Sequence, residues 1–176
     1  MAKRILYIVG EYPSVTETFV QREIEGLRER GMSIEVCPLA GLVPGELLSA
    51  ALRAPWQLCG LMLRHSRELD SCSWRRRIGS AVKALAIARI YPRVEHLHAH
   101  FLSAPALTAY YLSRVLHIPY SLTAHAHDIY VETTPSVVLK KARFRTTCTE
   151  SNVRYMAEKE PTAPFVLVRH GIDAQY

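Results

Sequence analysis

Apolar and polar residues recur along the chain with two periods, which predict strands and helices in turn. Residues 4–9 are almost all apolar, as in a parallel strand that is buried on both faces. Residues 16–30 carry apolar side chains at helical spacing, and residues 33–38 alternate as a second strand does. A strand, a helix and a strand in this order form a βαβ unit, so the two strands are expected to be parallel.

Local signals mark both ends of the first predicted helix. Ser14 is followed three residues later by Glu17, which predicts a capping box at the helix start. Gly31 stands where a helix that ends near residue 30 needs its C-terminal glycine.

The alternation continues to the end of the chain after one interruption. A helical excursion over residues 45–91 contains two helical stretches, at residues 46–65 and 74–91. The order predicts an α/β domain spanning residues 1–176, with a doubly wound, mostly parallel, Rossmann-like sheet of six strands and helices on both faces. The later strands are expected at residues 94–99, 120–124, 144–148 and 165–169, and the later helices at 104–116, 136–142 and 150–159.

Composition narrows the class of protein. Hydrophobic residues make up 49% of the chain and charged residues 22%, as in an ordinary soluble domain. The four cysteines lie far apart and form no Cys-x-x-Cys pair, which favours free thiols in a reducing compartment. The apolar run after Arg4 is too short for a signal peptide, and Arg53 and Pro55 interrupt residues 47–63, so no membrane-spanning segment is expected. A cytoplasmic protein is therefore predicted.

The net charge of +6 is concentrated in one segment. Residues 53–93 contain nine basic and two acidic residues, a net charge of +7, so the rest of the chain has a net charge of −1. Tryptophans beside arginines on amphipathic helices are typical of contact with an anionic membrane surface or a lipid-linked acceptor. Alternatively, these helices cover the sheet and their arginines are solvated. The residues concerned are Trp56, Trp74, Arg75, Arg76 and Arg77.

Polar residues gather where the predicted strands end. In an open parallel sheet, ligands bind at the carboxyl ends of the strands. Segments 10–19, 98–101, 123–128 and 169–173 lie at such ends and contain most of the residues capable of chemistry. Because the chain has no Gly-x-Gly-x-x-Gly after the first strand, no Gly-Lys-Ser/Thr and no Gly-x-Ser-x-Gly, a standard dinucleotide site, a P-loop nucleotidase and an α/β-hydrolase are all disfavoured.

The histidines leave a metal-dependent hydrolase open as an alternative. Three of them recur at every second residue, which places them on one face of a strand, and two more with an aspartate follow the next strand. Otherwise the first histidine faces solvent and the others form hydrogen bonds at the sheet edge. Metal geometry does not follow from a histidine count, so we expect no metal. The residues concerned are His96, His98, His100, His125, His127 and Asp128.

Several short segments follow one another in a distinctive order. They are Leu6-Tyr7-Ile8, Tyr12-Pro13, Thr16-Glu17-Thr18-Phe19-Val20, Glu23-Ile24, His98-Ala99-His100-Phe101, Ile118-Pro119, Thr123-Ala124-His125-Ala126-His127-Asp128-Ile129-Tyr130 and His170-Gly171-Ile172-Asp173. In this order they resemble the N-terminal domain of family-4 glycosyltransferases with the GT-B fold, in the branch with a Ser-Glu-Thr-Phe motif. The resemblance covers nearly the whole chain apart from residues 40–93. Thr16 stands where that branch has serine, and His170 where it has asparagine.

The resemblance implies a two-domain enzyme that transfers a sugar with retention of anomeric configuration and without a metal or other cofactor. This chain would supply the acceptor side, and a C-terminal domain absent from it would bind most of the nucleotide-sugar donor, so the chain alone would be inactive. The complete hexosyltransferase would act on a saccharide or lipid-linked acceptor in polysaccharide or exopolysaccharide biosynthesis, in the cytoplasm or at the inner face of the membrane. Nucleic acid is not an expected partner. The alternative is a non-catalytic sugar- or nucleotide-binding module.

His125 is the expected catalytic residue. It follows a predicted strand, so a neutral imidazole there would donate a hydrogen bond to the transferring sugar. The alternative is a packed histidine that bonds to a backbone carbonyl. Asp128 either orients His125 or His127, or binds acceptor hydroxyls, or caps the segment that follows.

The remaining expected contacts are with substrate. Glu17 and Thr18 lie at a predicted helix N-terminus, where backbone N–H groups favour a donor phosphate, although Glu17 would repel that phosphate if it only completes the capping box. His100 either touches substrate or packs at a strand end. His127 and Gly171 complete the expected substrate-binding set.

Overall fold

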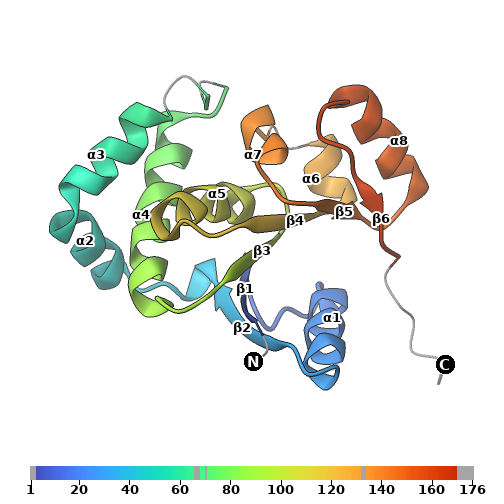
Figure 1. Ribbon diagram of the computed structural model, residues 1–176, viewed down its shortest axis with the longest axis horizontal. Coiled ribbons are helices and arrows are strands. Elements are labelled where there is room, and N and C mark those ends of the chain that lie inside the picture. The colour runs from blue at the N-terminus through green and yellow to red at the C-terminus, as the bar shows by residue number, and fades with distance from the viewer. Residues whose placement is uncertain (1–2, 66–67, 70, 132–133, 170–176) are drawn as a thin grey trace.

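Parallel strands form one six-stranded sheet in the order β2-β1-β3-β4-β5-β6, so the strand order reverses between β1 and β3 (Figure 1). The computed structural model describes residues 3–65, 68–69, 71–131 and 134–169. The predicted α/β class with a parallel, Rossmann-like sheet is confirmed. The strands are β1 (Arg4–Val9), β2 (Ser33–Pro38), β3 (His96–His100), β4 (Tyr120–Ala124), β5 (Arg145–Thr147) and β6 (Val166–Leu167).

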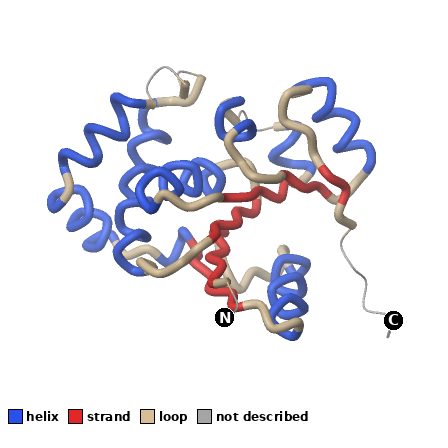
Figure 2. The backbone as a smooth tube through the Cα atoms, in the orientation of Figure 1, coloured by secondary structure: helices blue, strands red, loops and turns tan. Residues whose placement is uncertain are grey.

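Helices lie on both faces of the sheet, but unevenly. They are α1 (Thr18–Glu29), α2 (Pro44–Arg53), α3 (Pro55–Arg64), α4 (Trp74–Ile90), α5 (Ala104–Leu116), α6 (Ala126–Tyr130), α7 (Ser136–Lys140) and α8 (Glu150–Lys159), with a 3-10 turn η1 at Leu39–Gly41. Figures 1 and 2 show α1 on one side of the sheet and α4, α5 and α7 on the other. Alternate residues of β1 separate the two cores: Leu6 and Ile8 join the larger one, and Tyr7 and Val9 pack with α1.

The face that carries α1 is polar from β3 onward. Because side chains alternate along a strand, β3 and β4 turn Leu97, Ala99 and Leu122 to the larger core and their polar residues to the opposite face. That polar part of the sheet lines a groove of about 900 Å³, which also borders α1. The polar side chains on this face are those of His96, His98, Ser121, Thr123 and Thr146.

The ends of α1 differ in how well the sequence predicts them. The expected capping box is wrong, because Glu17 is the N-cap residue and makes no side-chain capping bond, while Ser14 Oγ lies 3.2 Å from Thr16 Oγ1. The C-terminal glycine is confirmed: Gly31 has a φ of +83°, a left-handed conformation that glycine adopts without a Cβ penalty. The N–H of Met32 donates to the carbonyl of Leu27 at 3.1 Å, which closes the helix.

The first helical stretch of the excursion is two helices rather than one. The expected helix over residues 46–65 is interrupted at Ala54, whose φ of −135° and ψ of 47° are not helical. Pro55 causes the break, because it has no N–H to donate and disfavours helical geometry in the residue before it. Both α2 and α3 pack against α4 rather than covering the sheet.

No helix in the described part of the chain is long and apolar enough to cross a bilayer. The sequence predicts α5, β4 and α8 with their observed ends. It does not predict α6, which begins directly after His125 and forms part of the surroundings of this histidine.

Candidate functional site

The ends of β3 and β4 bring two histidines together beside α1. His100 is the last residue of β3, and His125 follows β4 directly. The two strands are adjacent and parallel, with His100 opposite Thr123. Next to His100, Phe101 has a φ of +74°, which is uncommon for a residue with a side chain and is often found at functional sites. The carboxyl edge therefore carries the cluster that the sequence places there.

Asp128 holds the turn around His125. Its Oδ1 accepts the backbone N–H of His125 at 2.7 Å, and its Oδ2 accepts the backbone N–H of Leu102 from the loop after β3. The ring of His125 in turn accepts the backbone N–H of Asp128. Burial raises the pKa of Asp128 to about 6, although these backbone hydrogen bonds oppose the rise. Asp128 therefore acts as the cap that the sequence leaves open as an alternative, and it ties two carboxyl-edge loops together.

His100 lies between His125 and a carboxylate of α1. It is fully buried; its Nδ1 is 3.3 Å from His125 Nε2, and its Nε2 is 3.6 Å from Glu23 Oε1. The hydroxyl of Tyr7 donates to the same Glu23 oxygen at 2.9 Å. Burial alone would raise the pKa of Glu23, but His100, His98 and Tyr7 together lower it to about 2. Glu23 is therefore an anion at neutral pH.

The other expected substrate residues are dispersed. Glu17 is the N-cap of α1, and its Oε2 is buried without a hydrogen-bond partner among the described residues. Burial raises the pKa of Glu17, while the nearby His100 opposes the rise. Thr18 and His127 are exposed, in α1 and α6. Gly171 lies outside the described residues.

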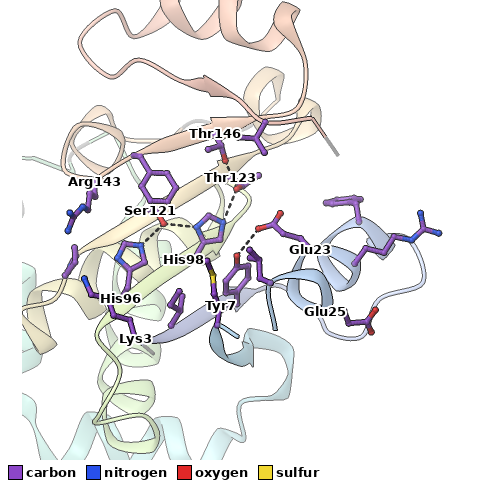
Figure 3. Close-up of a pocket in the computed structure, with 18 of the residues that line it drawn as sticks. Lys3, Tyr7, Glu23, Glu25, His96, His98, Ser121, Thr123, Arg143 and Thr146 are labelled. Carbon is purple, nitrogen blue, oxygen red and sulfur yellow. Dashed lines mark hydrogen bonds between the residues drawn. The ribbon is translucent and has the colours of Figure 1, made fainter. Parts of the chain in front are cut away.

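A hydrogen-bonded ladder crosses the polar face beside this cluster (Figure 3). The links are His96 Nε2 to Ser121 Oγ at 2.8 Å, Ser121 Oγ to His98 Nδ1 at 2.7 Å, and His98 Nε2 to Thr123 Oγ1 at 3.0 Å. Thr123 Oγ1 then lies 2.7 Å from Thr146 Oγ1. Burial lowers the pKa of His98 to about 3, so its imidazole is neutral. In the ladder, His98 forms hydrogen bonds as the non-metal alternative expects, whereas His96 bonds to Ser121 instead of only facing solvent.

The sequence patterns do not single out several residues of the site. Glu23 and Tyr7 lie within the listed motifs without an assigned role, and Ser121 lies in none of them. A usable signal exists: polar residues at every second position of adjacent parallel strands predict one polar face, and β3 and β4 both carry it.

A metal site is the alternative use of this cluster. Glu23, His98 and His100 each offer one ligand atom, and these atoms lie within 4.8 Å of one another. Both ring nitrogens of His98, however, already pair with the hydroxyls of Ser121 and Thr123. A metal ion here would have to displace one of these bonds, so the arrangement fits a hydrogen-bonded network better than a ligand set.

The basic segment, residues 53–93, contains α3 and α4 and lies away from this site (Figure 1). Trp56 is 86% exposed and Trp74 63% exposed, so neither is buried against the sheet. The guanidinium of Arg75 lies 5.5 Å from the centre of the Trp74 ring, and Arg75 and Arg76 are exposed. Arg77 is half-buried and donates to the carbonyl of Met62 at 3.3 Å.

Comparison with known proteins adds no assignment. No protein-family model matches the chain, and no curated protein matches it either. The function is therefore inferred from the site and from the sequence motifs.

Proposed function

We propose that this chain is the acceptor-side domain of a retaining glycosyltransferase, and that His125 is its catalytic residue. The observation that carries the proposal is the placement of buried His125 at the carboxyl edge, where ligands of open parallel sheets bind, beside the end of β3, at which the strand order reverses. The ordered motifs of the sequence support the same assignment.

The surroundings of His125 suit a hydrogen-bond donor. Its Nε2 faces His100, so the ring atom that accepts the Asp128 N–H is Nδ1, and the ring hydrogen of a neutral imidazole is on Nε2. An Nε2–H at this edge would donate a hydrogen bond to an oxygen of the transferring sugar and hold that sugar in position for the reaction. In this role the donor would be a nucleotide sugar, bound largely by a second domain, and no metal or organic cofactor would take part.

Exposed residues of the excursion favour a lipid-linked acceptor. Trp56 and Trp74 are exposed beside Arg75 and Arg76, which is the combination expected at an anionic membrane surface. In this proposal the basic helices hold the enzyme at the inner face of the membrane, while the carboxyl edge receives the sugar acceptor.

The test is transfer by the full polypeptide that contains this chain. Nucleotide sugars are supplied one at a time with membrane extract as the acceptor source, and release of nucleoside diphosphate and the anomeric configuration of the product are measured. Transfer with retention from one donor supports the proposal. Saturable binding without transfer would instead indicate a binding module. Turnover that requires stoichiometric zinc or manganese would indicate a metal-dependent hydrolase.

A further inference from the structure

We infer that Glu23 and His100 are positioning residues for His125: they form a chain of polar contacts that runs from α1 through the end of β3 to the end of β4. The inference rests on the proposed function for its consequence in catalysis. The chain of contacts itself is defined by Glu23 Oε1 to His100 Nε2 at 3.6 Å and His100 Nδ1 to His125 Nε2 at 3.3 Å.

Each contact determines which ring nitrogen of a neutral histidine carries the hydrogen. The Asp128 N–H occupies Nδ1 of His125, so His125 Nε2 carries the hydrogen and faces His100 Nδ1. His100 Nδ1 must then accept, which leaves the hydrogen of a neutral His100 on Nε2. That nitrogen faces the Glu23 carboxylate, an acceptor of hydrogens only. A single pattern of tautomers therefore satisfies every contact.

The α1 end of this chain of contacts is also held in place. Glu23 contributes the anion that holds the far end, and Tyr7 fixes that anion with a 2.9 Å hydrogen bond.

The long distance between His125 and His100 leaves the Nε2–H of His125 available to bind substrate. Its contact with His100 is longer than the 2.9–3.0 Å that is usual for N–H donors, so this hydrogen bond is weak. A sugar oxygen at the carboxyl edge can therefore compete for the Nε2–H, while His100 and the stacked arrangement of the rings, whose planes differ by 17°, keep the imidazole in place. In this way α1 acts on the reaction through His100 without touching the sugar.

The first test measures tautomers, independently of any activity. ¹⁵N NMR of the 176-residue protein should show hydrogen on Nε2 of both His100 and His125 at neutral pH. In Glu23→Gln, the amide can donate to His100 Nε2, so His100 should become a mixture of tautomers and the Nε2–H of His125 should exchange faster with water. Glu25→Gln is the matched control, because Glu25 is exposed on the same helix. A His100 that carries its hydrogen on Nδ1, or a spectrum unchanged by Glu23→Gln, would overturn the inference.

The second test uses transfer by the full polypeptide. Glu23→Gln should lower kcat with little change in KM, by between about 10-fold and the roughly 10⁴-fold that a wrong tautomer costs behind a reacting histidine. His100→Asn keeps an acceptor near the place of Nδ1 and should retain more activity than His100→Leu. Equal losses in the two variants would show that His100 only fills space. Zinc that is bound stoichiometrically by the wild type and lost in Glu23→Gln would also refute the positioning role.

The two failures can be told apart. If the tautomers are as stated but no donor supports transfer, the proposed function is wrong and the inferred chain of contacts stands. If transfer occurs but Glu23→Gln changes neither the spectra nor kcat, the proposed function stands and the positioning role is wrong.

Discussion

His98 should make the folded protein sensitive to acid, and replacing it should remove that sensitivity. The ring is buried between two hydroxyls, and burial lowers its pKa to about 3, against 6.5 for a free histidine. In the folded state it stays neutral over a range where the unfolded chain takes up a proton. Its contribution to stability is therefore present above pH 6.5 and is lost as the pH falls toward 3.

The expected magnitude follows from proton linkage. One pKa unit corresponds to about 1.36 kcal/mol, so a histidine that charges only in the unfolded chain costs about 2 kcal/mol between pH 6.5 and pH 4.5. Asp128 acts in the opposite direction, because its raised pKa makes the folded state gain stability as the pH falls from about 6 toward 3.8. The pH dependence of wild-type stability therefore does not isolate His98. The difference in pH dependence between the wild type and a His98 variant does.

The assay is urea unfolding at pH 6.5 and pH 4.5. Wild type should lose about 2 kcal/mol more than His98→Asn over this interval, whatever the variant costs at neutral pH. His117→Asn is the control, because His117 is exposed and has a φ of +56° that asparagine tolerates. Parallel pH dependences for wild type and His98→Asn would mean that His98 is charged or solvated in the folded protein. They would refute the buried, neutral His98 between Ser121 and Thr123.

Two further predictions concern stability and membrane contact. Asp128→Ala leaves the buried N–H groups of Leu102 and His125 without their acceptor, so the free energy of unfolding should fall by about 2–6 kcal/mol in urea titrations; a loss near that of the exposed control Glu158→Ala would show that Asp128 is not needed as a cap. Replacing Arg75, Arg76 and Arg77 with glutamine should weaken cosedimentation with anionic vesicles by about 2 kcal/mol, because each lipid-facing arginine contributes about 1 kcal/mol and Arg77 is held by Met62. Failure of the folded wild type to bind such vesicles at low salt would contradict the membrane proposal.

The sequence predicts the framework because its signals are local. An apolar run of the right length identifies β1, and Gly31 ends α1 because glycine adopts the required positive φ without a Cβ penalty. The error at Ser14 arises because its hydroxyl bonds to Thr16, a local competitor that the spacing does not reveal. Pro55 divides the excursion through a local effect that the apolar pattern conceals.

The site depends on contacts across distant parts of the chain. His100 and His125 are 25 residues apart and meet because β3 and β4 are neighbours, which topology alone makes predictable. Glu23 reaches His100 because α1 lies beside the polar face, and nothing in the local sequence of α1 indicates which side chain Glu23 will meet. Tautomers follow only from such contacts, so the role of His100 could not be settled from the sequence.

In the proposed mechanism, the Nε2–H of His125 donates a hydrogen bond to the reacting sugar and holds it in position. His125→Ser tests it most directly, because serine still caps α6 but offers no group at the place of Nε2. In the full polypeptide, kcat for sugar transfer should fall by about 10²–10³-fold relative to His117→Asn, with both variants as stable as wild type to within about 1 kcal/mol. Transfer at a near-normal rate by a folded His125→Ser protein would contradict the account.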